Sequence, residues 1–173
     1  MDYAVRMNIP VVLAPFGTRQ RLPVLSHVMQ AAAAHNVVTV ASVAGEVYGR
    51  LEWPALYALE GPEFGTFAVA GLTTDGGLLA QVPKAAQGVL AVPGENIVGL
   101  GIHSSYGIGS GNAAAAAIVA AFVSMALAHR ETTYAELLNK LQKTPPPWTG
   151  TPSTGTPGIG ADVIKINAMT FLQ

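Results

Sequence analysis

The chain has 173 residues, 50% of them hydrophobic, no cysteine and a formal net charge of -1. These values predict one globular domain, 1–173, with a sizeable core, and they exclude a disulfide scaffold. The arginines are scattered, which argues against nucleic-acid binding, and the start of the chain does not resemble a signal peptide, so we expect a cytoplasmic bacterial protein.

The first third of the sequence has the pattern of a β-α-β unit. Continuous apolar runs from Pro10 to Ala14 and from Val37 to Val43 indicate strands that are covered on both faces. The residues between them, Leu22 to His35, predict a helix. Because a helical crossover joins parallel strands, we expect an α/β fold with a mostly parallel sheet flanked by helices and a right-handed connection.

The middle of the chain, 46–101, is rich in Gly and Pro and contains short apolar runs. We interpret these runs as strands joined by turns. They are Thr66 to Leu72, Leu78 to Val82, Gly88 to Val92 and Ile97 to Leu100.

A long helix is predicted after Gly111. Asn112 is interpreted as its N-cap, and the basic pair His129-Arg130 suits its C-terminal end. The apolar stretch from Ala113 to Ala128 is shorter than the about 20 residues that span a bilayer. We therefore expect a buried helix and no membrane contact.

A second helix is predicted to run to Lys143. Thr132 or Thr133 is its expected cap, and Glu136 stands three residues after Thr133, as in a capping box. The Pro- and Thr-rich segment 144–157 predicts an extended surface loop. No second domain or internal repeat is indicated.

The segment from Ser110 to Ala121 carries the most informative pattern. It reads Ser-Gly-Asn-Ala-Ala-Ala-Ala-Ala-Ile-Val-Ala-Ala, and it resembles the nucleophile segment of the subtilisin-like serine proteases, Ser-Gly-Thr-Ser-x-Ala-Ala-Pro-x-Val-Ala-Gly. Four more segments resemble blocks of that family in the same order: Tyr3 to Gly17, Leu25 to Gly45, Val89 to Val98 and Gly158 to Asn167. The resemblance implies a subtilisin-like fold that lacks the N-terminal portion of the family.

The same resemblance implies that catalysis is lost. Ala113 stands in the position of the catalytic serine, and a methyl group is no nucleophile. Glu46 stands where the family has its oxyanion asparagine, and its carboxylate would repel a forming oxyanion. The family's catalytic Asp and His belong to the portion that is not matched. We favour natural loss of activity. The alternative is a C-terminal piece of a split or processed serine endopeptidase in which Ala113 replaces an original serine and a partner chain supplies Asp and His.

The peptide-binding surface of the family is matched more fully than its catalytic residues. The resemblance implies that a substrate would lie extended along one segment, like an added strand, beside a specificity pocket lined by a second segment. Pro15 lacks a donor, so an ordinary turn between strand and helix is the alternative reading. The implied binding residues are Ala14, Pro15, Phe16 and Gly17 in the first segment and Ala41, Ser42, Val43, Ala44 and Gly45 in the second.

Other candidate sites receive less weight. The four histidines show no metal-ligand spacing with carboxylates, and Gly107-x-Gly109-x-Gly111 lacks the Lys-Ser/Thr pair of a phosphate loop, so we predict neither metal nor cofactor. A new nucleophile-base pair among His103, Ser104 and Ser105 is a minor alternative. Trp53 and Trp148 are interpreted as packing residues, and contact with a bound peptide is the alternative.

The charged fraction gives an indication of partners. Charged residues make up 11% of the chain, against about 25% in typical soluble domains. We expect surface covered by a partner, most simply in a homodimer, although an interior rich in small residues is an alternative. The sequence therefore predicts an inactive protein that binds a peptide or protein segment, for example a precursor peptide in a bacterial biosynthetic pathway. A purely structural subunit is a third possibility.

Overall fold

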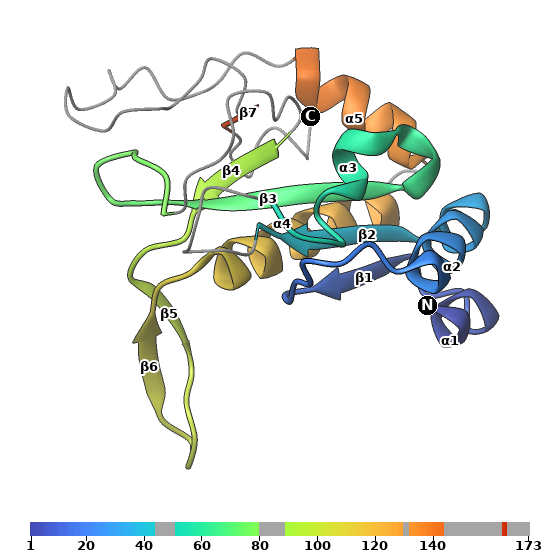
Figure 1. The fold of residues 1–173 in the computed structure, drawn as a ribbon. Helices are drawn as coiled ribbons and strands as arrows, with labels where there is room; N and C mark the ends of the chain where they lie inside the picture. Colours follow the sequence, from blue (N-terminus) through green and yellow to red (C-terminus); the bar gives the residue numbers. More distant parts are fainter. Residues whose placement is uncertain (44–50, 80–88, 130–131, 144–163, 166–173) are drawn as a thin grey trace.

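A parallel β-sheet forms the middle layer of the molecule (Figure 1). The computed structural model describes residues 1–43, 51–79, 89–129, 132–143 and 164–165. In the described residues the sheet has five strands in the order β1-β2-β3-β4-β7, and every neighbouring pair is parallel. The strands are β1 (Val11–Ala14), β2 (Val38–Ser42), β3 (Thr66–Leu72), β4 (Val89–Pro93) and β7 (Ile164–Lys165). The expected α/β fold with a mostly parallel sheet is confirmed.

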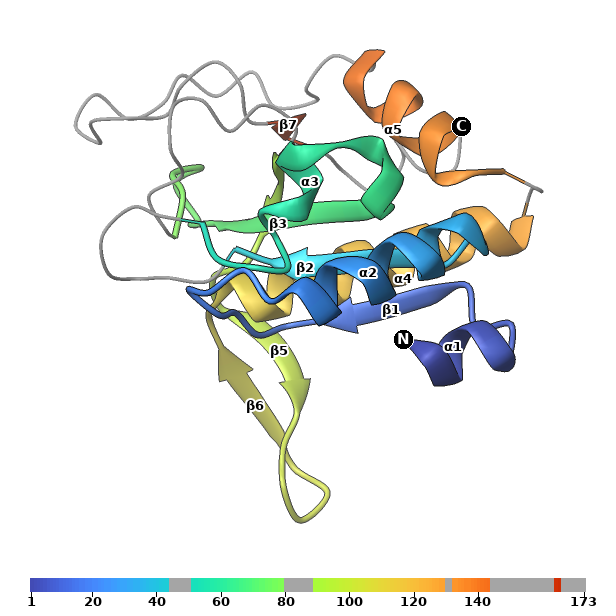
Figure 2. The same cartoon turned by 45° about the vertical axis from the view of Figure 1, so that its right-hand side comes forward.

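Helices cover both faces of this sheet (Figure 2). One face carries α1 (Asp2–Arg6), α2 (Pro23–Ala34), α3 (Tyr57–Glu60) and the short 3-10 helix η1 (Pro62–Phe64). The other face carries α4 (Asn112–His129), and α5 (Tyr134–Lys143) packs near its C-terminal half through Leu137. None of the helices in the described ranges is long and apolar enough to span a lipid bilayer.

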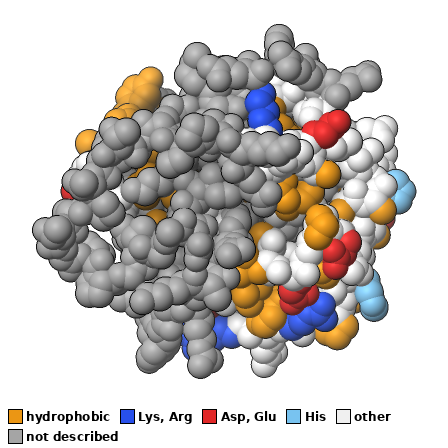
Figure 3. All heavy atoms as spheres, turned by 90° about the horizontal axis from the view of Figure 1, so that it is seen from above, with side chains coloured by type: hydrophobic (Ala, Val, Ile, Leu, Met, Phe, Trp, Pro, Cys, Tyr) orange, Lys and Arg blue, Asp and Glu red, His pale blue; other side chains and the backbone are white. Residues whose placement is uncertain are grey.

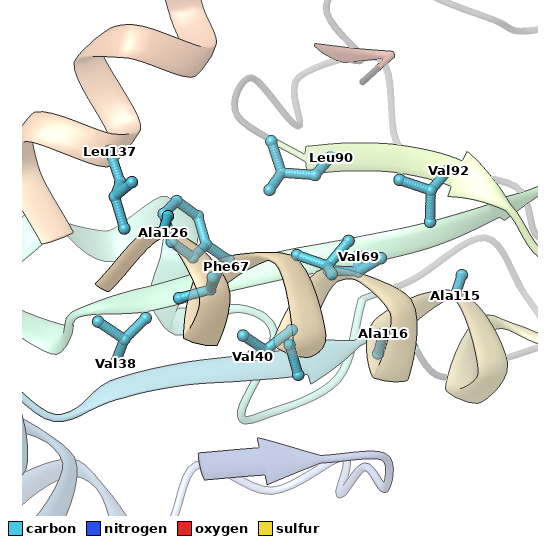
Figure 4. Close-up of a cluster of buried hydrophobic side chains, with 13 residues drawn as sticks. Val38, Val40, Phe67, Val69, Leu90, Val92, Ala115, Ala116, Ala126 and Leu137 are labelled. Carbon is cyan, nitrogen blue, oxygen red and sulfur yellow. The ribbon is translucent and has the colours of Figure 1, made fainter. Parts of the chain in front are cut away.

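The two faces of the sheet carry side chains of different size. Successive residues of a strand point to opposite faces, so each strand contributes to both layers. The face under α4 is built from large side chains, shown in Figure 4: Val38, Val40, Phe67, Val69, Leu90 and Val92. The opposite face, which α3 helps to cover, is dominated by alanine: Ala14, Ala41, Ala68 and Ala70, with Val43 and Val89. Both layers consist of buried apolar side chains, and the sheet is the centre of the core.

The β1-α2-β2 unit forms as the sequence predicts. Pro23 occupies the first turn of α2, where its missing N–H costs no helical hydrogen bond. The helix buries Ser26, Met29 and Ala32, and the chain reverses after it at Asn36, whose φ is 59°. The parallel register of β1 and β2 then begins with Val11 opposite Val38.

The predicted start of α5 is also confirmed. The Thr133 N–H donates to Glu136 Oε2 at 2.8 Å, and the Glu136 N–H donates to Thr133 Oγ1 at 3.3 Å. These reciprocal bonds are those of a capping box. The same contacts hold the pKa of the Glu136 carboxyl below its usual value, because a hydrogen bond from an N–H stabilises the ionised form.

Other local predictions need correction. Asn112 is the first residue of α4 and not its cap, because the Gly111 carbonyl accepts the bond from the Ala115 N–H. Of the predicted strand from Leu78 to Val82, the described part forms one bridge between Leu72 and Leu78. Residues 80–82 and the predicted loop 144–157 lie outside the described residues.

A hairpin that the sequence did not predict precedes α4. Its strands are β5 (Ile97–Leu100) and β6 (Tyr106–Gly109), paired antiparallel in a separate sheet. Figures 1 and 2 both show it projecting away from the main sheet. Only β5 was expected as a strand, and its partner β6 was overlooked.

Candidate functional site

The candidate site lies at the carboxyl ends of the parallel strands. Ala14, the last residue of β1, pairs with Ala41 of β2, so the two segments that sequence reasoning selected for peptide binding end side by side. The chain leaves β4 toward the β5-β6 hairpin and then enters α4 next to the ends of β3 and β4. Ligand sites of open α/β sheets typically form at this edge.

Hydrogen bonds fix the segment that carries Ala113. Asn112 Oδ1 accepts a bond from the Gly71 N–H at 2.8 Å, and the Gly111 N–H donates to the Gly94 carbonyl at 2.8 Å. Gly71 belongs to β3 and Gly94 directly follows β4. The start of α4 is therefore tied to the ends of two central strands.

Close backbone approach explains the two glycines in this anchor. A Cβ atom added to Gly94 would lie 2.7 Å from the Gly71 Cα, and one added to Gly71 would lie 3.2 Å from the Gly94 Cα. The first distance is shorter than a real carbon-carbon contact. Glycine at both positions lets the strand ends meet closely enough for Asn112 to reach the Gly71 N–H.

Ala113 itself occupies an exposed position in the first turn of α4. The N–H groups of a first helical turn have no partner within the helix and carry partial positive charge. The position could therefore stabilise a developing anion. The Ala113 methyl group has no lone pair with which to attack a carbonyl, so this residue cannot form an acyl-enzyme.

The His103-Ser104-Ser105 cluster lies in the turn of the projecting hairpin. His103 and Ser104 have φ values of 55° and 58°, which close the turn, and Ser105 Oγ donates to the Ile102 carbonyl at 2.7 Å. The Ser105 hydroxyl thus serves the turn and is not paired with His103. This geometry gives the minor alternative of a new nucleophile-base pair no support.

The first predicted binding segment is exposed where it leaves the sheet. Ala14 is buried, whereas Pro15, Phe16 and Gly17 are exposed, and the Phe16 side chain is 63% accessible. The segment ends at Thr18, which exchanges two backbone hydrogen bonds with Trp53, at 2.8 and 3.0 Å. The turn is consequently held at both ends while its apolar side chain faces solvent.

The backbone of β1 offers an outer edge. The Val38 N–H donates to the Pro10 carbonyl, so Pro10, Val12 and Ala14 direct their polar groups toward β2. Alternate residues point the other way, so Val11 and Leu13 direct theirs away from the described sheet. Pro15 continues this outer row with a carbonyl and no donor. An added strand could exchange bonds with two residues and donate to a third.

The second predicted binding segment is only partly described. Ala41, Ser42 and Val43 are 0–4% exposed, and Ala41 and Val43 pack in the alanine-rich core layer. The side chains of these three residues are enclosed in the fold. Among the described residues they therefore do not line an open pocket. Ala44, Gly45 and Glu46 lie outside the described residues, and their assigned roles stay predictions.

A cluster missed by sequence reasoning braces the loop after β1. Arg21 donates to both carboxylate oxygens of Glu60, at 3.2 and 2.9 Å, and its guanidinium lies 5.8 Å from the centre of the Tyr57 ring. The Arg21 hydrogen bonds hold the pKa of the Glu60 carboxyl below its usual value. Trp53 Nε1 also donates to Glu60, at 3.4 Å. The partners are up to 39 positions apart, so no local pattern announces them.

The packing interpretation of Trp53 is confirmed. Its ring lies against the buried cluster of Met29, Tyr57 and Phe64, between α2 and α3. Trp148 lies outside the described residues. His27 on α2 and His35 directly after it are both exposed. Among the described side chains, no three of His, Asp and Glu gather as metal ligands do.

Comparisons with solved structures identify the architecture. No protein-family model and no curated protein matches the sequence. The prenylagaramide maturation protease PagA matches with a TM-score of 0.77 at 18% identity, over 99% of this chain and 63% of that one. A serine-to-alanine mutant of the protease domain of PatA matches with a TM-score of 0.74 at 20% identity, over 99% and 61%. The chain has a subtilisin-like fold.

A third similar structure is the PatG macrocyclase in complex with a peptide. Its TM-score is 0.69 at 18% identity, over 85% of this chain and 46% of that one. The chain thus spans less than two thirds of the length of these proteins. The subtilisin-like fold implied by the sequence resemblance is confirmed. Ala113 is the second residue of α4, and its assignment to the nucleophile position stays a prediction.

Proposed function

We propose that this subtilisin-like chain binds an extended peptide or protein segment without cleaving it. The ligand lies along the outer edge of β1 and against the turn formed by Pro15, Phe16 and Gly17. The observation that carries the proposal is this turn: Phe16, which is 63% exposed, lies between the buried strand residue Ala14 and the Thr18-Trp53 bridge. An exposed aromatic side chain on a fixed backbone is a typical anchor for an apolar peptide residue.

The proposal assigns no chemical step to the chain. Acyl transfer needs a nucleophile, and the candidate position holds Ala113. The ordered start of α4 can still receive a peptide carbonyl, because its first N–H groups are unpaired within the helix. Binding at this edge therefore needs only backbone pairing and one apolar contact.

The structural neighbours support a peptide as the ligand. PatG was solved in complex with a peptide, and PagA is described as a maturation protease. By analogy, the ligand of this chain is a precursor peptide of a bacterial biosynthetic pathway, met in the cytosol. The analogy rests on the shared fold and on the exposed turn.

Titration calorimetry with candidate precursor peptides tests the proposal. Phe16→Ala should weaken binding about fivefold or more, because truncating a central aromatic anchor typically costs at least about 1 kcal/mol. Tyr3→Ala is the matched control, since Tyr3 is an aromatic residue with 62% exposure on α1. Equal affinities of the two variants would refute the assigned site. Mass spectrometry should recover the bound peptide uncut.

A second candidate function is that of a protease piece completed by another chain. Two findings favour it: one neighbour is itself a serine-to-alanine mutant, and this chain spans 61% of that protein. Restoring Ala113→Ser then distinguishes the candidates. Under the lead proposal the variant alone neither cleaves peptides nor reacts with a fluorophosphonate probe, because an unactivated serine is a poor nucleophile. Labelling that appears on adding a partner chain would establish the second function.

A further inference from the structure

The β5-β6 hairpin has one strongly apolar face. Val98 pairs with Ile108 and Leu100 pairs with Tyr106, so these four side chains lie on the same side of the two strands. Ile102 adds to them in the turn. All five residues are 65–88% exposed, and none of them belongs to a core cluster.

The opposite face of the hairpin carries glycine at three positions. Gly99 pairs with Gly107 there, and Gly109 pairs with Ile97. A Cβ atom added to Gly99, Gly107 or Gly109 would meet no atom within 4 Å. Neither face is therefore covered by the described part of the chain.

The base of the hairpin is firmly attached to the domain. The Asn96 N–H donates to Ser110 Oγ at 3.0 Å, and the Gly111 N–H donates to the Gly94 carbonyl at 2.8 Å. These two bonds hold the β5-β6 hairpin at its base in its projecting direction. A two-stranded hairpin on its own is marginally stable in water, and exposed apolar patches of this kind typically mark interaction surfaces.

The absence of charged residues indicates what kind of surface covers the β5-β6 hairpin. Residues 96–129 contain no Asp, Glu, Lys or Arg, so the hairpin and the helix that follows it present no formal charge other than any carried by histidine. A partner selected by charge complementarity has nothing to recognise here. An equally uncharged apolar hairpin is the best complement, and a second copy of the chain supplies one.

We propose that two copies of this chain form a symmetric dimer by packing the apolar faces of their β5-β6 hairpins against each other. A two-fold axis makes such a contact self-complementary, because the same residues meet on both sides. The exposed surface of the five large residues amounts to roughly several hundred Å² per copy. This area is of the same order as the about 800 Å² that each partner buries in a standard interface. The dimer does not depend on the proposed peptide site.

Analytical ultracentrifugation over a concentration series tests the dimer on the chain as it stands. Ile108→Glu should raise the dimer dissociation constant roughly 100-fold or more, because each dimer would bury two unpaired carboxylates. Leu100→Lys tests the same face with the opposite charge, which keeps the test valid if one variant folds poorly. Circular dichroism should show both variants folded, since these side chains contact no core cluster.

Two controls separate the apolar face from other effects. Val24→Glu adds the same charge at a residue 72% exposed on α2, against 73% for Ile108, and should leave the dimer intact. Gly107→Thr adds a side chain to the glycine face of the same hairpin, where there is open space, and should also leave it intact. A wild-type chain that stays monomeric at all concentrations would overturn the proposal. A different protein would then be the partner that covers the hairpin. A dimer that survives both charge variants would overturn it as well.

Discussion

Asn112→Ala tests the anchor that ties the start of α4 to the sheet. The substitution removes the side-chain oxygen that accepts the hydrogen bond from the Gly71 N–H. Gly71 is a buried residue of β3. Leaving a buried donor unpaired costs about 1–3 kcal/mol. For a chain of this size each kcal/mol lowers the melting temperature by roughly 2–4 °C. We therefore expect a fall of about 2–12 °C in thermal unfolding, together with faster amide exchange at Gly71.

A conservative variant at the same position is the control. Asn112→Asp keeps an oxygen that can accept the Gly71 bond, and its negative charge suits the N-terminal end of α4. It should retain most of the stability and the slow exchange at Gly71. If Asn112→Ala unfolds at the wild-type temperature, or if the Asp variant is as unstable as the Ala variant, the anchor does not act through this hydrogen bond.

Two further substitutions test the packing around β3. Gly94→Ala should destabilise the protein by about 1–3 kcal/mol in chemical denaturation, because its Cβ would approach the Gly71 Cα to 2.7 Å, whereas Gly99→Ala, in open space, should be neutral. Tyr134 donates to the Thr66 carbonyl at 2.7 Å, and burial raises its pKa to about 12 from about 10. Because the pKa is raised in the folded state, the stabilising contribution of Tyr134 should be fully present below pH 10 and lost as the pH rises toward 12. The Tyr134→Phe variant should therefore lose less stability than the wild type over that range. Identical pH profiles of the two proteins would contradict the assignment.

The sequence was most informative where one strand is covered on both faces. The run from Thr66 to Leu72 matches β3 residue for residue, because a strand buried on both sides reads as a continuous apolar segment. The Thr133-Glu136 capping box was equally readable, since its partners are three positions apart. Local periodicity and local hydrogen bonding are sufficient in both cases.

The sequence was less informative where distant contacts decide. Tyr106–Gly109 alternates aromatic or aliphatic residues with glycine, which has a low strand propensity, and it becomes a strand by pairing with Ile97–Leu100. Asparagine is a common residue type at helix N-caps, yet the Asn112 side chain accepts a hydrogen bond from the Gly71 N–H, 41 positions away. The brace between Arg21 and Glu60 spans 39 positions. Tertiary pairing of this kind leaves no trace in a local window.

The unequal side-chain sizes on the two faces of the sheet set opposite rules for sequence change. Beneath α4, large residues such as Phe67 and Leu90 fill the space, so truncation there opens a void. On the alanine face, the methyl groups of Ala41, Ala68 and Ala70 already fill the gap, so enlargement there must push the covering layer outward. A randomised library should accordingly reject small residues on one side of each central strand and large residues on the other, with the tolerated volume alternating along the strand.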